Sequence, residues 1–332
     1  TGAEVYTVAP VSNSIYDANG NAASTSQSNN TVTLNDLTVP TITGTTVNAA
    51  NTKVVVTFSE AVYDTNGGNG ALEVGDFAVT IAANGGAAGL SSATPSAIAI
   101  SGNVYTLTLA TTGTATGAEV YTVAPVSNSI YDADGNVAST SQSNNTVTLN
   151  DLTAPTMAIT ASEGADGFTS NDATLSLTFT SSESTTTFAA ADITVTGGSL
   201  GTLSGSGTTY TATFTPTASG ATTIDVGADG FTDAVGNGNT AATQFNWTYD
   251  GTVPTITATA VNAANTKVTV TFSEAVYDTN GGAGDLEVTD FVFSISGGTA
   301  TLTSATPTAI AKTSQLIWVL DVDLTGTADG SE

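Results

Sequence analysis

The chain has no cysteine, no histidine and no arginine, and its only cationic side chains are Lys53, Lys267 and Lys312. Without cysteine it can form neither a disulfide framework nor a thiolate metal site. It also lacks the common catalytic base and the thiol nucleophile, and its serines have no histidine partner. Carboxylates are plentiful enough for carboxylate-pair hydrolysis. Because they recur with the sequence repeat described below, we expect no catalytic site.

Positive charge is scarce: three Lys and Arg stand against 29 Asp and Glu, and the net charge is −26 at pH 7. Nucleic acid and anionic lipid both need Lys or Arg to neutralise phosphate, so we expect neither as a partner. Such a surface attracts divalent cations instead. No run of about 18 apolar residues would span a membrane, and Thr1 does not begin a signal peptide. We expect any export signal or anchor to lie outside this segment.

What the chain does have is long internal repeats. Residues 1–38 return as residues 116–153 with two changes, Asn19 to Asp134 and Ala22 to Val137. A second block starts at Pro40 and returns from Pro254 with a few substitutions. Near-identity between neighbouring segments indicates recent duplication. This kind of copying is typical of stalks, filaments and arrays of binding modules.

Apolar residues alternate with Thr, Ser and other polar residues along several short stretches, among them residues 53–58, 105–109, 175–179 and 245–249. This period of two predicts half-buried strands, and no helical periodicity with caps is visible. About seven strands fit each complete domain, which is the number expected of an immunoglobulin-like sandwich. The sequence therefore predicts an all-β fold of tandem immunoglobulin-like β-sandwich domains in an extended array, with Trp247 and Trp318 in the cores.

Three linkers, each with an Asp, a short spacer and a Pro, divide the chain at residues 35–41, 150–156 and 249–255. Proline fixes its own φ and keeps the preceding residue out of the helical region, so the linkers are predicted to be extended and stiff. Residues 38–152 are predicted to form a complete domain and residues 153–252 a divergent complete one. Residues 1–37 match the C-terminal part of such a domain, and residues 253–332 match the N-terminal part.

Neither terminal piece is expected to be stable alone, since one exposes a core and an unpaired edge and the other is too short to bury enough surface. We therefore expect that Thr1 and Glu332 are not natural termini. Two accounts remain open. The segment is a window from a longer chain, or residues 1–37 of one copy complete residues 253–332 of another in a head-to-tail fibre.

Acidic side chains recur at corresponding positions of every repeat and are the candidate metal ligands. They are Asp36, Glu60, Asp76, Asp132, Asp134 and Asn136 for the first complete domain; Asp151, Glu183, Asp192, Asp233 and Asn237 for the second; Asp250, Glu274 and Asp290 for residues 253–332; and Asp17 and Asn21 in residues 1–37.

The strand order of a seven-stranded sandwich brings these positions to one end of each domain. Successive strands run away from and back towards the entry point, so the linker, the end of the second strand, the start of the third and the loop between the sixth and seventh meet beside the preceding domain. Carboxylates gathered with almost no cation repel one another unless an ion lies between them. Oxygen-only ligands suit Ca²⁺.

Two simpler interpretations compete with the calcium prediction. An acidic surface keeps a protein soluble or adapts it to high salt, which explains the total charge but not its placement. The loop Asp132-Ala-Asp134-Gly-Asn136 is by itself ordinary turn chemistry. The recurrence of the whole set favours calcium.

The FSExV…DF pattern, the DxxGN loop and the linkers from Asp36 to Pro40, Asp151 to Pro155 and Asp250 to Pro254 resemble the bacterial immunoglobulin-like repeats of large secreted surface adhesins. The resemblance covers the whole chain. It implies an extracellular stalk, often rigidified by calcium, of the kind found in biofilm-forming and gliding bacteria. The partners expected are neighbouring repeats or further copies, with an unknown surface or glycan ligand at a distal tip. A laterally packed sheath or surface layer, and an array of carbohydrate-binding modules, are the alternatives.

Overall fold

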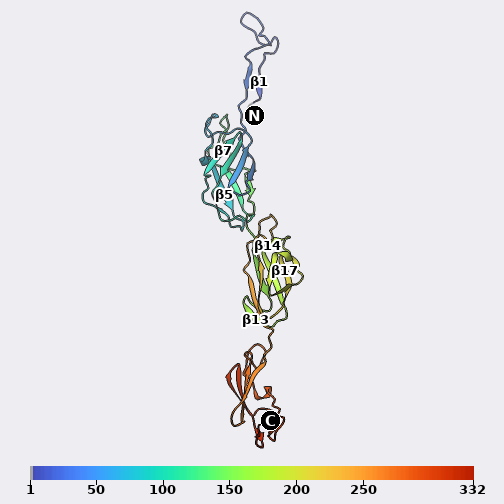
Figure 1. The fold of residues 1–332 in the computed structure, drawn as a ribbon. Helices are drawn as coiled ribbons and strands as arrows, with labels where there is room; N and C mark the ends of the chain where they lie inside the picture. Colours follow the sequence, from blue (N-terminus) through green and yellow to red (C-terminus); the bar gives the residue numbers. More distant parts are fainter. Residues whose placement is uncertain (1–2) are drawn as a thin grey trace.

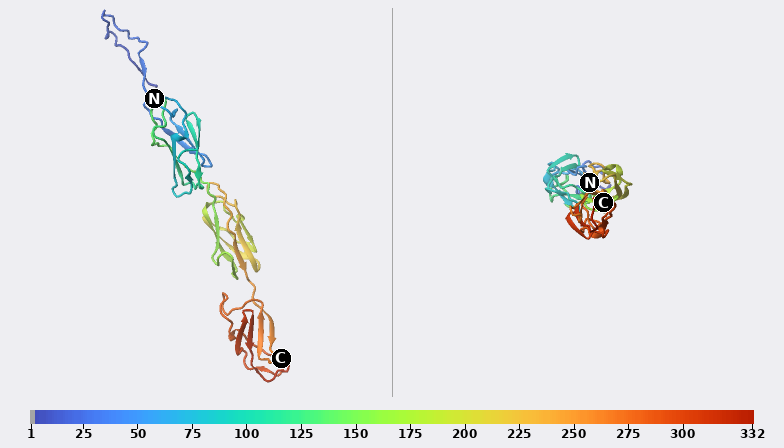
Figure 2. Two further views of the ribbon diagram at one scale, coloured as in Figure 1. Left: turned by 90° about the vertical axis from the view of Figure 1, so that its left-hand side faces the viewer. Right: turned by 60° about the horizontal axis from the view of Figure 1, so that its bottom comes forward.

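The structure, a computed structural model that describes residues 3–332, is a rod of β-sandwiches joined end to end (Figures 1 and 2). A thin N-terminal hairpin (residues 3–37) projects from one end and is followed by domain 1 (residues 38–152), domain 2 (153–252) and domain 3 (253–332). The helical segments among residues 3–332 are three 3₁₀ turns, η1 (Val74–Asp76), η2 (Ala190–Asp192) and η3 (Val288–Asp290). None of them is long or apolar enough to cross a membrane. The all-β prediction is confirmed.

Domain 1 packs a four-stranded sheet against a three-stranded one. In spatial order these are β3 (Ile42–Val47), β4 (Lys53–Phe58), β8 (Val104–Thr108) and β7 (Ala97–Ser101), facing β11 (Thr146–Thr148), β10 (Val120–Pro125) and β5 (Phe77–Ala82), with the short pair β6 (Gly89–Leu90) and β9 (Thr111–Thr112). The predicted alternation is confirmed in β4, where Val54, Val56 and Phe58 are buried. Burying one face of each sheet provides the hydrophobic driving force.

Domain 2 has two four-stranded sheets, so it holds one more strand than the seven predicted. They are β12 (Met157–Ala161), β14 (Leu175–Thr185), β17 (Ser204–Pro216) and β16 (Gly198–Leu200), facing β13 (Phe168–Ser170), β19 (Phe245–Tyr249), β18 (Gly220–Val226) and β15 (Ile193–Thr196). β13 pairs with β19 in parallel. Trp247 on β19 is buried as predicted, and its Nε1 donates to Ser170 Oγ at 3.0 Å.

Domain 3 has one complete sheet, formed by β20 (Ile256–Val261), β21 (Lys267–Phe272), β24 (Ile317–Asp321) and β23 (Ala309–Ser314), and the short pair β22 (Thr301–Leu302) and β25 (Leu324–Thr325). Trp318 on β24 is buried, again as predicted. Residues 291–296 correspond to β5 of domain 1 but form no strand here. The N-terminal hairpin pairs β1 (Val5–Thr7) with β2 (Thr31–Thr33), in the register that β10 and β11 share in domain 1.

Candidate metal centre

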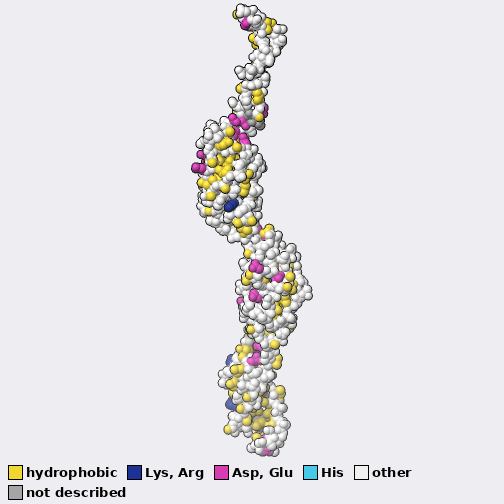
Figure 3. All heavy atoms as spheres, turned by 45° about the horizontal axis from the view of Figure 1, so that its top comes forward, with side chains coloured by type: hydrophobic (Ala, Val, Ile, Leu, Met, Phe, Trp, Pro, Cys, Tyr) yellow, Lys and Arg dark blue, Asp and Glu magenta, His cyan; other side chains and the backbone are white. Residues whose placement is uncertain are grey.

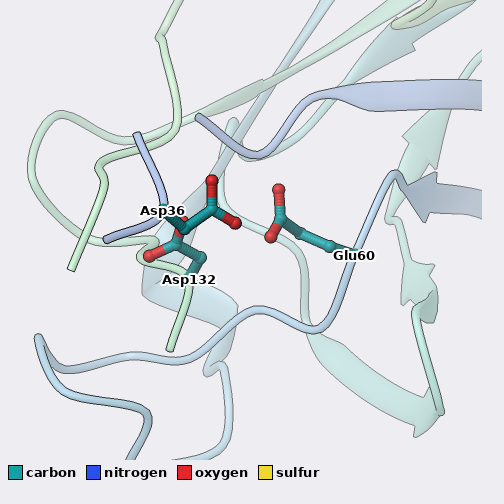
Figure 4. Close-up of side chains that lie close together, drawn as sticks. All are labelled: Asp36, Glu60 and Asp132. Atoms are coloured by element: carbon teal, nitrogen blue, oxygen red, sulfur yellow. The ribbon is translucent and has the colours of Figure 1, made fainter. Parts of the chain in front are cut away.

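Two groups of three carboxylates lie at the domain ends. The first triad is Asp36, Glu60 and Asp132, and the second triad is Asp151, Glu183 and Asp233. In each triad the three residues offer oxygen atoms that all lie within 4.8 Å of one another. Figure 4 shows the first triad, with the three side chains contributed by separate segments of the chain. Acidic side chains also gather in the space-filling view where the N-terminal hairpin meets domain 1 (Figure 3).

The strand order brings the first triad together at the N-terminal pole of domain 1. Asp36 lies in the linker after β2, and Glu60 lies two residues beyond the end of β4, which returns antiparallel to β3. Asp132 lies in the loop between β10 and β11. The side-chain amide of Asn136 links two of these segments, because its Nδ2 donates to Asp132 Oδ2 at 2.7 Å and to the Asp36 carbonyl at 3.1 Å.

A tight loop fixes the third carboxylate of each triad. Asp132 Oδ1 accepts the backbone N–H groups of Asp134 and Asn136 at 3.0 and 2.8 Å. An ionised carboxylate has about four lone-pair sites, so the loop bonds, with that from Asn136 Nδ2, leave room for a further ligand. The turn chemistry considered above is therefore present, and it holds the Asp132 carboxylate beside Glu60 rather than competing with a role as a ligand.

The second triad crosses the junction between domains 1 and 2. The backbone around Asp151 belongs to domain 1, since Asp151 forms a bridge with Thr116 and the next N–H, of Leu152, donates to the Ala115 carbonyl at 2.9 Å. The other two carboxylates come from domain 2, from β14 and from the loop that follows β18. The Nδ2 of Asn237 donates to the Asp151 carbonyl at 3.3 Å and repeats the arrangement of the first triad.

The glutamate of each triad, Glu183 or Glu60, has a raised pKa. Burial, and then the charges of Asp151 and Asp233, raise the pKa of Glu183. Burial, followed by the charges of Asp132 and Asp36, likewise raises the pKa of Glu60. Each glutamate thus lies partly desolvated beside other carboxylates, which disfavours its ionised form.

Among residues 3–332, no lysine side chain forms an ion pair with a triad carboxylate. Domain 2 contains no Lys, Arg or His at all, and the lysine of domain 1, Lys53, begins β4 at the end opposite Glu60. The other two lysines pair with Asp321 and Asp285 inside domain 3. Ca²⁺ takes oxygen ligands at about 2.3–2.6 Å, so oxygens on opposite sides of one ion lie about 5 Å apart. The spacing within each triad therefore fits a single shared Ca²⁺.

The structure does not bring the aspartates of the three 3₁₀ turns into the triads. Asp76, Asp192 and Asp290 each end a 3₁₀ turn, and each carboxylate accepts the backbone N–H three residues earlier at 2.7–2.8 Å. Burial raises the pKa of Asp76. These carboxylates close the turn that precedes β5 in domain 1, β15 in domain 2 and residues 291–296 in domain 3. The spacing Glu73-x-x-Asp76 resembles a helix-capping pattern and is the sequence signal for this role.

The predicted asparagines and the second loop aspartate also differ from simple ligands. Asn136 and Asn237 present amide nitrogens, not oxygens, to Asp132 and Asp233, and so they position those carboxylates. The side chain of Asp134 is exposed, although its charge contributes to the raised pKa of Glu60.

The remaining predicted residues lie at the two ends of the rod. Asp17 and Asn21 form the same loop in the N-terminal hairpin, with Asn21 Nδ2 donating to Asp17 Oδ2 at 2.8 Å. Asp250 is exposed and accepts the Thr252 N–H. Glu274 Oε1 is buried and has no hydrogen-bond partner among the described residues. Domain 3 has no counterpart of the Asp132 loop, so these two carboxylates are not part of a triad.

Comparisons with known proteins agree with this architecture. Residues 151–249 match the family model described as a bacterial Ig-like domain. No curated protein sequence matches the chain. Among solved structures, the chain is similar to the Escherichia coli adhesin FdeC, with 14% identity and a TM-score of 0.31 over 87% of this chain and 88% of that one. It is also similar to invasin, a bacterial integrin-binding protein, with 16% identity and a TM-score of 0.28 over 86% of this chain and 54% of invasin. The strand order makes the chain an array of tandem immunoglobulin-like β-sandwich domains, and its residues 151–249 match the bacterial Ig-like family.

Proposed function

We propose that this chain is a stalk segment of an extracellular bacterial adhesin or surface filament, and that calcium at the domain junctions makes the stalk rigid. The observation that carries the proposal is the second triad, in which Asp151 of domain 1 faces Glu183 and Asp233 of domain 2. The rod-like succession of domains supports a role in projecting a distal element, which binds a surface or a glycan, away from the cell (Figure 1).

The proposed mechanism is mechanical. An ion held by carboxylates of both domains relieves their mutual repulsion and adds bonds across a junction whose linker is only a few residues long. Hinge motion between the domains then requires the metal to lose a ligand. The partly buried glutamates make the empty state unfavourable, so the ion acts both on the interdomain angle and on domain stability.

Calcium binding is tested with the full chain, in calcium and in excess chelator, by calorimetric melting and small-angle X-ray scattering. We expect calcium to raise the melting temperature and to narrow the distribution of interdomain angles. A ligand at 100 times its Kd stabilises the folded state by about 2.7 kcal/mol. Asp233→Asn removes one triad carboxylate and should abolish the response of domain 2. Asp225→Asn removes the same charge from β18 and should preserve it. Identical melting and scattering with and without chelator would contradict the proposal.

A stalk of this kind carries out no reaction. The chain offers neither histidine nor cysteine for catalysis, and both carboxylate clusters repeat between domains. We expect no turnover of polysaccharide substrates by the full chain. Hydrolysis that a single carboxylate substitution abolishes would overturn this part of the proposal.

A further inference from the structure

The four-stranded sheet of domain 1 ends in an uncharged edge strand, β7. Within residues 3–332 this strand pairs with β8 alone, in a regular register from Ala97↔Thr108 to Ser101↔Val104. Its sequence, Ala-Ile-Ala-Ile-Ser, contains neither a charge nor a proline. Such an edge can accept a further strand, because the backbone groups on its outer side have no partner within the sheet.

The exposed side chain of Ile100 distinguishes this edge within the two complete domains. Ile100 is 45% exposed, and of the large apolar side chains that are exposed in residues 38–252 it is the one that lies in a strand. It borders a hollow of about 420 Å³ that is also lined by Tyr63 and Tyr105. Ile98 lies on the same face of β7 and packs against the core. The edge thus carries an apolar row that reaches from the core to the surface.

The corresponding edge of domain 3 is protected. In β23, Lys312 stands where β7 has Ile100, and a register shift between Lys312 and Ser314 interrupts the pairing with β24. Lys312 pairs with Asp285, and its Nζ lies 6.0 Å from the centre of the Trp318 ring. A lysine and a bulge are two devices by which natural sheets prevent edge-to-edge pairing. β7 has neither, so the same strand is left open in domain 1.

The chain around β7 is also free of charge. Residues 77–118 contain no Asp, Glu, Lys or Arg, although the net charge of the chain is −26. Two copies of so acidic a chain repel one another, and the repulsion is weakest where neither copy brings a charge to the contact. A cationic partner would be drawn to the acidic ends of the domains instead. The neutral strand therefore favours a second copy of this chain as the occupant of the edge.

The β7–β8 hairpin determines which backbone groups β7 turns outward. Its loop has two residues, 102 and 103, so Ser101 and Val104 beside the loop form a hydrogen-bonded pair. Backbone pairing alternates along an antiparallel ladder, so the residue next to such a pair points its N–H and C=O groups to the other side. Ile98 and Ile100 therefore present theirs to the free edge.

We propose that two copies of the chain pair through β7, with the two strands antiparallel about a two-fold axis at Ala99. Ile98 of each copy then lies opposite Ile100 of the other, and each of these pairs exchanges both of its backbone hydrogen bonds. The two four-stranded sheets become one continuous sheet, and the second copy covers the exposed Ile100. Because the same surface is used on both copies, the contact closes as a dimer.

The antiparallel arrangement determines the direction of the two rods. The strands of domain 1 run along the rod (Figure 1), so the paired chains lie side by side and point in opposite directions. If the chain serves as the proposed stalk, such a pair joins stalks that reach from facing surfaces. The contact uses none of the triad carboxylates, so it stands or falls independently of the calcium sites.

The pairing is tested by sedimentation velocity of the full chain over a range of concentrations, at physiological ionic strength, where charges more than about 8 Å apart are largely screened. We expect the weight-average mass to rise and to level off at twice the monomer mass. Ile100→Lys, a change that domain 3 accommodates at Lys312, should hold the chain at monomer mass. Thr80→Lys adds the same charge at an exposed position of β5, the edge strand of the opposite sheet, and should dimerise like the unmodified chain.

Two results would overturn the pairing. One is monomer mass of the unmodified chain at every concentration, which would leave a strand of a different protein as the occupant of the edge. The other is dimerisation of Ile100→Lys as strong as that of Thr80→Lys. Circular dichroism of both variants establishes that each is folded.

The register has its own test, because the chain contains no thiol. The two-fold axis places Ala99 of one copy opposite Ala99 of the other, at a Cα separation of about 4.5 Å that permits a disulfide. Ala99→Cys should therefore give a disulfide-linked dimer under mild oxidation. Ala97→Cys, on the same face of β7, lies opposite Ser101 of the other copy and should not. Equal crosslinking of the two variants would contradict the antiparallel register, since a parallel, in-register pair places every residue beside its own counterpart.

Discussion

At the scale of single residues, the glutamates of the triads would couple the proposed metal binding to proton release. In metal-free protein, burial and the charges of Asp151 and Asp233 raise the pKa of Glu183 above its ordinary value of 4.5. The folded state then holds a proton that the unfolded state releases. The free energy of unfolding therefore falls as pH rises from 4.5 through the folded-state pKa, and below 4.5 this loss is absent. Calcium binding would require the ionised form of Glu183, so calcium would raise the free energy of unfolding over the pH range in which it otherwise falls.

This gives a pH prediction for domain 2. In chelator, its melting temperature should fall as pH rises from 4.5 towards 7, and Glu183→Gln should flatten that part of the profile. Trp247 fluorescence reports domain 2 alone in a Trp318→Phe background. Added calcium should restore stability at pH 7 in the parent chain but not in the variant. A profile that keeps its slope in Glu183→Gln would show that another group titrates there.

Asp233 acts in a separate pH window. Burial raises the pKa of Asp233, but the hydrogen bonds from the side chain and backbone of Asn237 outweigh it and lower the pKa below 3.8. This stabilisation is present above pH 3.8 and is lost as pH falls through the folded-state pKa. The two effects can therefore be told apart in one titration.

At the scale of secondary-structure elements, the repeated hairpin provides an internal comparison. β10 and β11 carry the same side chains as β1 and β2, but only the β10–β11 pair is extended by a third strand, β5. Removing a buried aromatic side chain costs about 3–5 kcal/mol, so Tyr121→Ala should destabilise domain 1 by that amount. Tyr6→Ala should change stability by less than about 0.5 kcal/mol, as for an exposed surface position.

Chemical denaturation, with hydrogen exchange followed in domain 1 for Tyr121→Ala and in the hairpin for Tyr6→Ala, measures both values. The sequence around the two tyrosines is identical from Thr1 to Ala18 and from Thr116 to Ala133, so differences in local propensity cancel. A large effect of Tyr6→Ala under these conditions would mean that the hairpin is packed in the monomer.

Several strands of the fold could be predicted from the sequence alone. Alternation predicted β4, β8, β14 and β19, because one buried face leaves a period of two. The same pattern could not show that residues 291–296 stay out of a sheet, since strand formation depends on a partner distant in sequence. Strand order likewise predicted that Asp36, Glu60 and Asp132 converge. It could not predict that Asp76 turns its carboxylate onto a nearby backbone N–H, because that choice depends on local turn geometry.

At the scale of the whole molecule, the shape of the rod depends on the angle between domains at each junction. Domains 1 and 2 have separate hydrophobic cores, and the second triad brings carboxylates of both domains together. Under the proposed function, a metal at this triad would change the bending of the rod more than the folding of domain 1. We therefore expect the angular distribution to respond to calcium at lower concentrations than does the unfolding of domain 1.

The parallel pairing of β13 with β19 has a consequence for a stalk under tension. The first strand of domain 2, β12, pairs with β14, so a load reaches the β13–β19 pair after β12 has been pulled from β14. The load then pulls β13 towards the N-terminal end and β19 towards the C-terminal end, so their backbone hydrogen bonds are sheared together instead of opening one by one. In domain 1 the last strand, β11, pairs with β10 alone, and β3 is held to the segment before β11 by side-chain bonds such as that from Thr45 Oγ1 to the Asn144 carbonyl. Single-molecule stretching should therefore unfold domain 1 at a lower force than domain 2, and the opposite order would contradict this assignment. In flowing water, domain 1 would unfold before domain 2, and the chain length that it releases would limit the force on domain 2.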